Sequence, residues 1–136
     1  MYVLIGWAIT VYHRPYLPDL LPSYTAFTAV MPWTLWGYAA GIGALLLMFA
    51  PPATWWRLIA HAWSATFFLM VTGTFTDGVG ITSAGTTYTV LGYVGIVLWA
   101  RNAVTIASQR EWWARIVNRP PPIIRWLAEW GQDGRD

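Results

Sequence analysis

The stretch that decides the fold class covers residues 29–50 and reads AVMPWTLWGYAAGIGALLLMFA. None of its 22 side chains carries a charge. Because a helix rises about 1.5 Å per residue, about 20 apolar residues cross a hydrocarbon core about 30 Å thick. We therefore predict that this stretch spans a membrane as a helix. Pro32 suits its first turn, and Pro51-Pro52 cannot continue it.

Two stretches that follow along the chain pass the same length test. The second runs from residue 54 to about residue 75 and ends in the turn residues 76–80, which include Asp77. The third runs from residue 84 or 86 to about residue 106. Its helical periodicity continues through residues 110–116, so we expect this helix to project beyond the bilayer.

The first 12 residues are apolar but would form only about 18 Å of helix, which is too short to span a bilayer unaided. They lack the basic region and cleavage site of a signal peptide, so we expect them to stay on the protein. They could lie in the interface, re-enter, or span a thinned bilayer, and all three alternatives stay open. Residues 15–22 hold three prolines and Asp19, which predicts an extended linker.

The composition agrees with a membrane protein. Only 10% of the 136 residues are charged, against about 25% in a typical soluble domain. Of the charged side chains, Arg57 and Asp77 alone fall within residues 25–100. We predict an all-α polytopic membrane protein with three transmembrane helices. It has an apolar N-terminal segment and linker (residues 1–24), a bundle (25–109) and an Arg/Trp-rich tail (110–136). The apolar N-terminal helix is a fourth transmembrane span if it crosses the bilayer.

The arginines predict the orientation. Six of the eight lie between residues 101 and 135, Arg57 lies beside the turn at residues 51–52, and residues 77–83 contain none. By the positive-inside rule, the tail and the turn are cytoplasmic and the Asp77 loop is outside. Arg14 is an exception to the positive-inside rule in this orientation, because the same order of spans places it outside. We expect the chain in a bacterial cytoplasmic membrane with its C-terminus in the cytoplasm.

Eleven tryptophans are the most unusual feature of the composition. Most lie near the ends of predicted spans, where an amphipathic ring prefers the headgroup zone. An interfacial aromatic belt therefore explains them better than a pigment or quinone site. Trp7 and Trp63 fall inside apolar stretches and are expected to pack against a neighbouring helix. The predicted belt comprises Trp33, Trp36, Trp55, Trp56, Trp99, Trp112 and Trp113.

A polar stripe is predicted on the second span. Its members recur at helical spacing, interrupted by Phe68, and are Thr54, Arg57, His61, Ser64 and Thr72. Ionisable groups at membrane depth usually face protein or water, so the stripe is a candidate lining for a water-filled path between associated copies. The alternative is that Arg57 snorkels to the interface and His61 bonds a neighbouring helix.

Gly37 and Gly41 form a GxxxG pair on the first span. Small residues four apart let two helix backbones approach closely, which favours helix association. The contact could lie within one chain or between chains. Gly92 and Gly95 on the third span could act in the same way.

The residues offer little for catalysis. The spans contain His61 but neither a carboxylate pair nor a serine with a paired base. The absence of cysteine excludes thiolate zinc sites. A haem between His13 and His61 is conceivable, but the Pro-rich segment beside His13 argues against it. We expect no enzymatic activity, no cofactor, no metal and no nucleic-acid partner. The expected partners are the lipid bilayer and either other copies or other membrane subunits.

The tail contains a predicted amphipathic helix. Ile123, Leu127 and Trp130 share one face, while Arg125 lies on another, four residues before Glu129. Such a helix is expected to lie on the cytoplasmic leaflet or to dock a soluble partner.

The order of these features resembles that of small membrane proteins encoded by tailed phages and prophages of GC-rich bacteria. The matching stretches are WTLWG at 33–37, WWR at 55–57 with Trp63, GTTY at 85–88 and LWAR at 98–101. Such proteins are often suspected to be holin-like. The resemblance implies an oligomer that permeabilises the cytoplasmic membrane during lysis. Two alternatives from other classes are a non-catalytic anchoring subunit of a larger membrane complex and a cofactor-binding electron carrier.

Overall fold

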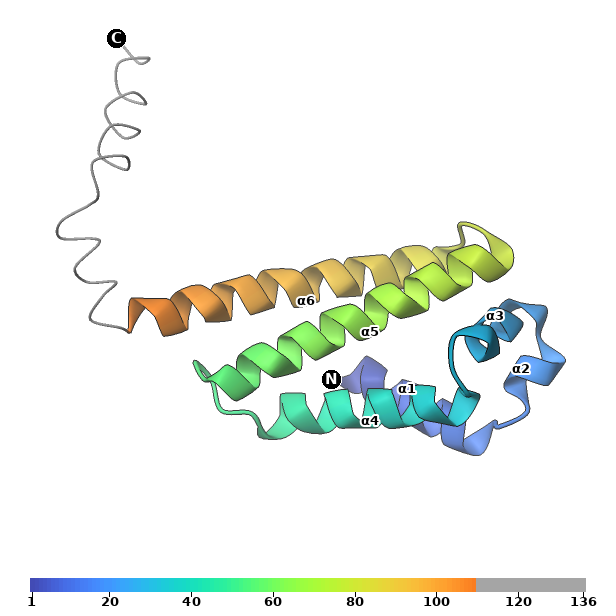
Figure 1. Ribbon diagram of the computed structural model, residues 1–136, viewed down its shortest axis with the longest axis horizontal. Helices are drawn as coiled ribbons and strands as arrows, with labels where there is room; N and C mark the ends of the chain where they lie inside the picture. Colours follow the sequence, from blue (N-terminus) through green and yellow to red (C-terminus); the bar gives the residue numbers. More distant parts are fainter. Residues whose placement is uncertain (110–136) are drawn as a thin grey trace, which may run out of the picture. The chain divides into compact units, whose positions relative to one another are not determined.

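The computed structural model describes residues 1–109, and this part of the chain contains helices and no strand. The all-α class is therefore confirmed. The helices, shown in Figure 1, are α1 (Tyr2–His13), α2 (Leu17–Leu20), α3 (Pro22–Val30), α4 (Trp33–Phe49), α5 (Trp55–Val79) and α6 (Ser83–Ser108). The predicted helix at residues 110–116 and the tail residues Ile123, Arg125, Leu127 and Trp130 lie outside the described residues.

Within residues 1–109, two helices, α5 and α6, are long and apolar enough to cross a membrane. A third crossing results only if α3 and α4 are counted as one span, and these two helices are bent by 78° at a short break. α1 is apolar but shorter. The described part of the chain is thus helical, with two helices that could cross a membrane and a broken pair.

The first predicted span begins later than the sequence suggested. We expected a helix from residue 29, but α4 begins at Trp33. The break lies at Met31 and Pro32, where Met31 is fully extended (φ −159°, ψ 158°). A residue before proline is driven out of the helical region by the proline ring, so α3 ends and α4 starts again in a new direction.

Two other boundaries differ from the predictions. Residues 76–80 are not a turn, because α5 continues to Val79 and places Asp77 in its last turn; the helix ends at Gly80, whose φ of 78° favours glycine. Residues 15–22 are not an extended linker. Pro18 and Pro22 lie in the first turns of α2 and α3, where a missing N–H removes no helical hydrogen bond.

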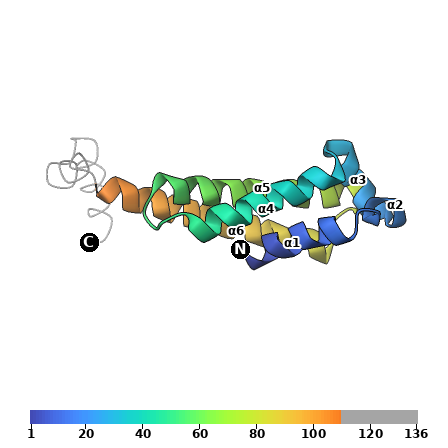
Figure 2. The same ribbon diagram turned by 90° about the horizontal axis from the view of Figure 1, so that it is seen from below.

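The core within residues 1–103 is built mainly from aromatic rings. α1 packs along α4, and α3 and α4 both pack on α5, as Figures 1 and 2 show from two sides. Trp36 and Phe27 are completely buried, and their ring centroids lie 5.0 Å apart. Other rings in contact with this pair or with each other belong to Trp7, Tyr24, Trp33, Phe67, Phe68, Phe75 and Tyr88.

α6 lies beside α5 in close contact along one face (Figure 1). A Cβ added at Gly92 would lie 2.8 Å from the Leu69 side chain, and one at Gly95 would lie 3.1 Å from the Ala65 Cα. The two helices can approach this closely because both positions lack a side chain. Gly92 and Gly95, which the sequence left open as small residues of low specificity, lie at a helix contact within the chain.

Candidate functional site

The polar stripe begins at the turn between α4 and α5. Thr54 is the N-cap of α5: its Oγ1 accepts a hydrogen bond from the Arg57 N–H at 3.3 Å and donates to the Pro51 carbonyl at 2.7 Å. A threonine here satisfies one of the unpaired N–H groups of the first turn. Thr54 therefore fixes the start of the helix that carries the stripe.

Arg57 turns back toward the end of α4. Its Nη1 donates to the Leu47 carbonyl at 2.6 Å and to the Ala50 carbonyl at 3.3 Å. The last carbonyls of a helix have no partner within it, and a positive charge is favourable at that end. The residue four positions after Leu47 is Pro51, which has no N–H to offer. Arg57 supplies the missing donor and ties α4 to α5.

Ser64 and Thr72 are also bonded within the chain. The Ser64 hydroxyl is buried and donates to the Ala60 carbonyl at 2.8 Å. The Thr72 hydroxyl donates to the Phe68 carbonyl at 2.9 Å and reaches the Gly85 carbonyl of α6 at 3.4 Å. Thr89 of α6 donates to Thr72 at 3.4 Å. These hydroxyls bond their own helix or α6.

His61 differs from the rest of the stripe. Its side chain is 9% exposed, and among the described residues the imidazole makes no hydrogen bond. A neutral imidazole carries one N–H donor and one acceptor nitrogen. Among the described residues the fully buried side-chain atom without a partner is Trp7 Nε1, so the His61 nitrogens are not sealed inside the bundle. His61 is thus the member of the stripe whose bonding capacity the described part of the chain leaves unused.

Asn102 was not predicted as a site residue. Its Nδ2 donates to the Thr54 carbonyl at 3.2 Å, which joins α6 to the start of α5. In the sequence, Asn102 served only to mark the end of the third span. A polar amide beside Arg101, at the end of a long apolar run, was the available signal, but its acceptor becomes evident only when α5 and α6 are placed side by side.

The Gly37 and Gly41 pair is divided between two environments. A Cβ at Gly37 would lie 2.8 Å from Val11 Cγ1, so this glycine allows α1 to pack on α4 within the chain. A Cβ at Gly41 would meet nothing within 4 Å. Gly43, which was not part of the predicted pair, is as crowded as Gly37, since its Cβ would lie 2.9 Å from Trp63.

The predicted tryptophan belt is only partly correct. Trp33 and Trp36 are core residues, and their indole N–H groups donate to the Arg14 and Phe27 carbonyls at 3.2 and 3.1 Å. Their positions at a predicted span end were misleading because α1 and α3 cover that end of α4. Trp55, Trp56 and Trp99 are exposed, as a belt requires.

The prediction that Trp7 and Trp63 pack against neighbouring helices is confirmed. Trp63 donates to the Ala39 carbonyl of α4 at 2.9 Å, and Trp7 contacts five other aromatic rings. The Trp7 indole N–H is buried and finds no hydrogen-bond partner in the part of the chain that the structure describes.

Two hollows lie beside α1. A groove of about 430 Å³ runs between α1 and α4 and is lined by Gly37, Gly41 and mostly apolar side chains. A smaller hollow of about 290 Å³ lies beside Trp7, Tyr24 and Tyr88. In residues 1–109, no three His, Asp or Glu side chains are grouped as a metal site would require.

The described residues form a small helical bundle with an aromatic core, a polar cluster at the α4–α5 turn and two helices that could cross a membrane. Comparison with protein families, curated proteins and solved structures gave no match.

Proposed function

We propose that the chain is a holin-like protein of the bacterial cytoplasmic membrane, which associates with its own copies and permeabilises that membrane without catalysis. The membrane setting is supported by the placement of charge on α5. Arg57 lies in the first turn and Asp77 in the last, and no charged residue lies between them. The 25 residues of α5 extend about 38 Å, which exceeds the hydrocarbon thickness of about 30 Å.

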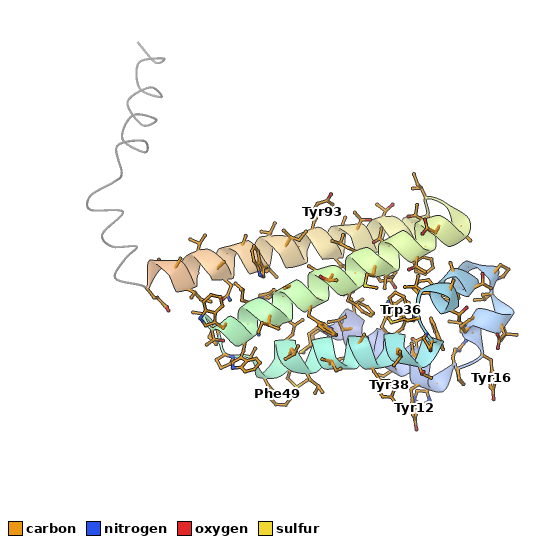
Figure 3. All side chains as sticks on the ribbon, viewed as in Figure 1. Tyr12, Tyr16, Trp36, Tyr38, Phe49 and Tyr93 are labelled. Atoms are coloured by element: carbon orange, nitrogen blue, oxygen red, sulfur yellow. The ribbon has the colours of Figure 1, made fainter. Side chains whose placement is uncertain are left out.

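The observation that carries self-association is the one-sided packing of α6. Its glycine face is packed on α5, whereas a row of large apolar side chains on the other side is exposed. Figure 3 shows Tyr93 of this row pointing away from the bundle. Such a helix offers its free face to lipid or to a second copy. The exposed row includes Val90, Tyr93, Val94, Val97 and Leu98.

Permeabilisation requires a polar surface at membrane depth. Arg57, Ser64 and Thr72 are bonded within the chain, so they do not offer one unless these bonds break. His61 has bonding capacity to spare, and water or a second copy would satisfy it. We therefore assign the wet surface of the assembled form to His61.

The second candidate function is that of a non-catalytic subunit that anchors a larger membrane complex. The internal bonding of Arg57, Ser64 and Thr72 favours this candidate, because a bundle whose polar groups are already paired has little need to open. In that case His61 only packs within the bundle and lines no water-filled path, so membrane integrity does not depend on it.

Leakage on induction separates the two candidates. Wild type, His61→Leu and the control Met70→Leu, an exposed position on the same helix, are compared at matched membrane abundance. We expect His61→Leu to insert normally, since the change removes a polar group from the membrane. We also expect it to release less dye than wild type, while Met70→Leu leaks as wild type does. Equal leakage from all three variants would remove His61 from the mechanism, and no leakage from any would leave the anchoring subunit.

A further inference from the structure

The groove between α1 and α4 has the size and lining of a binding site for an apolar chain. Its volume of about 430 Å³ lies within the range of small-molecule pockets. Gly37 and Gly41 lie along the α4 side, and the empty space around a Cβ at Gly41 shows that this part of the wall is open. The other lining residues are Ala8, Val11, Tyr12, Pro15, Thr34, Tyr38, Ile42 and Leu45.

Two cationic or titratable residues lie beside the groove in the chain. Tyr12 and Pro15 line the groove, and the two residues between them, His13 and Arg14, are exposed and are not themselves part of its lining. Among the described residues, no ion pair or side-chain hydrogen bond engages the Arg14 guanidinium. Figure 3 shows Tyr12 and Tyr38 extending from the bundle on the same side. Tyrosine prefers the headgroup level of a bilayer, where its hydroxyl remains wet.

We propose that this groove binds an anionic phospholipid, with one acyl chain along Gly41 and the phosphate on Arg14 and His13. The positive charge of Arg14 distinguishes the two candidate occupants of the groove, a lipid and a second copy of the chain. A lipid presents a negative phosphate and an apolar chain together, and the arginine fork binds phosphate oxygens in pairs. A second copy offers apolar surface, but within residues 1–109 only Asp19 and Asp77 could pair with Arg14 across such a contact. Lipid binding also accounts for Arg14 on the side where the positive-inside rule does not expect it.

The site is independent of permeabilisation and requires only that the chain lies in a bilayer. Native mass spectrometry of the full chain, released from detergent with palmitoyl-oleoyl phosphatidylglycerol or phosphatidylcholine, measures retained lipid and oligomeric state together. We expect wild type to retain phosphatidylglycerol in preference to phosphatidylcholine. Arg14→Gln should reduce that preference about tenfold, as expected for the loss of one charged hydrogen bond.

Two glycine variants provide the matched comparison. Gly41→Leu fills the groove, whereas Gly73→Leu places the same side chain at another glycine with nothing within 4 Å. We expect Gly41→Leu to lose the retained lipid and Gly73→Leu to keep it. Equal retention by the two variants, or an Arg14→Gln protein that keeps the full headgroup preference, would overturn the proposal. A fall in dimer with unchanged lipid in Gly41→Leu would place a second copy in the groove and also overturn it. Arg14→Gln alters an exposed residue and keeps the test valid if Gly41→Leu fails to fold.

Discussion

At the scale of single residues, the role of Arg57 in the polar stripe depends on which backbone carbonyls lie within reach of its guanidinium. The sequence places Arg57 one turn into a membrane helix, and this position is consistent with snorkelling or with a wet path. The structure gives it a third role, since its Nη1 bonds the Leu47 and Ala50 carbonyls at the end of α4. That role follows from Pro51, which leaves the Leu47 carbonyl without a helical donor.

Removing this guanidinium should destabilise the bundle. We expect Arg57→Leu to lower the free energy of unfolding by about 2 kcal/mol, as typical for a hydrogen bond from a charged group to an otherwise unpaired carbonyl. Arg57→Lys keeps the charge but not the fork, so it should fall between this variant and wild type. Unfolding in mixed micelles of rising SDS content measures all three. Unchanged stability in Arg57→Leu would show that the side chain only snorkels.

The environment of a tryptophan near a span end is likewise not determined by its own position in the sequence. An indole near the end of an apolar run fits the interface and the core equally well, because it combines a large apolar ring with one donor. Trp55 and Trp56 are exposed, whereas Trp33 and Trp36 are buried under α1 and α3. The difference depends on which elements fold over α4, and hydropathy does not encode that.

At the scale of elements, the sequence predicts the existence of the long helices better than their ends. Apolar runs of more than 20 residues located α5 and α6, and Pro51-Pro52 located the end of α4. The break at Met31 and Pro32 was missed because proline also fits a first helical turn. The continuation of α5 through Asp77 was missed because turn-forming residue types are tolerated in a last helical turn, and only Gly80 has a backbone conformation that ends it.

The α5–α6 contact gives a prediction at this scale. Gly95→Val should destabilise the bundle by about 1 to 3 kcal/mol, because its Cβ would lie 3.1 Å from the Ala65 Cα and α6 would have to shift. Gly73→Val is the matched control, since it places the same side chain where nothing lies within 4 Å. Micellar unfolding distinguishes them, and equal stability of the two variants would contradict the close contact.

At the scale of the whole molecule, the orientation of the chain is testable because its sequence contains no cysteine. We expect an impermeant thiol reagent to label Ser83→Cys from outside the cell and to leave Ser108→Cys unlabelled until the membrane is opened. The reason is the concentration of arginine after residue 100, which by the positive-inside rule is expected to keep that end in the cytoplasm. The reverse labelling pattern would invert the topology.

In the proposed function, copies of this chain alone permeabilise a bilayer by associating within it. The most direct measurement is dye release from liposomes that contain the purified full chain at a series of protein-to-lipid ratios. We expect dye release to rise more steeply than linearly with protein density, in step with the appearance of oligomers in crosslinked samples. Liposomes that stay sealed at every density, with the protein inserted and correctly oriented, would contradict it.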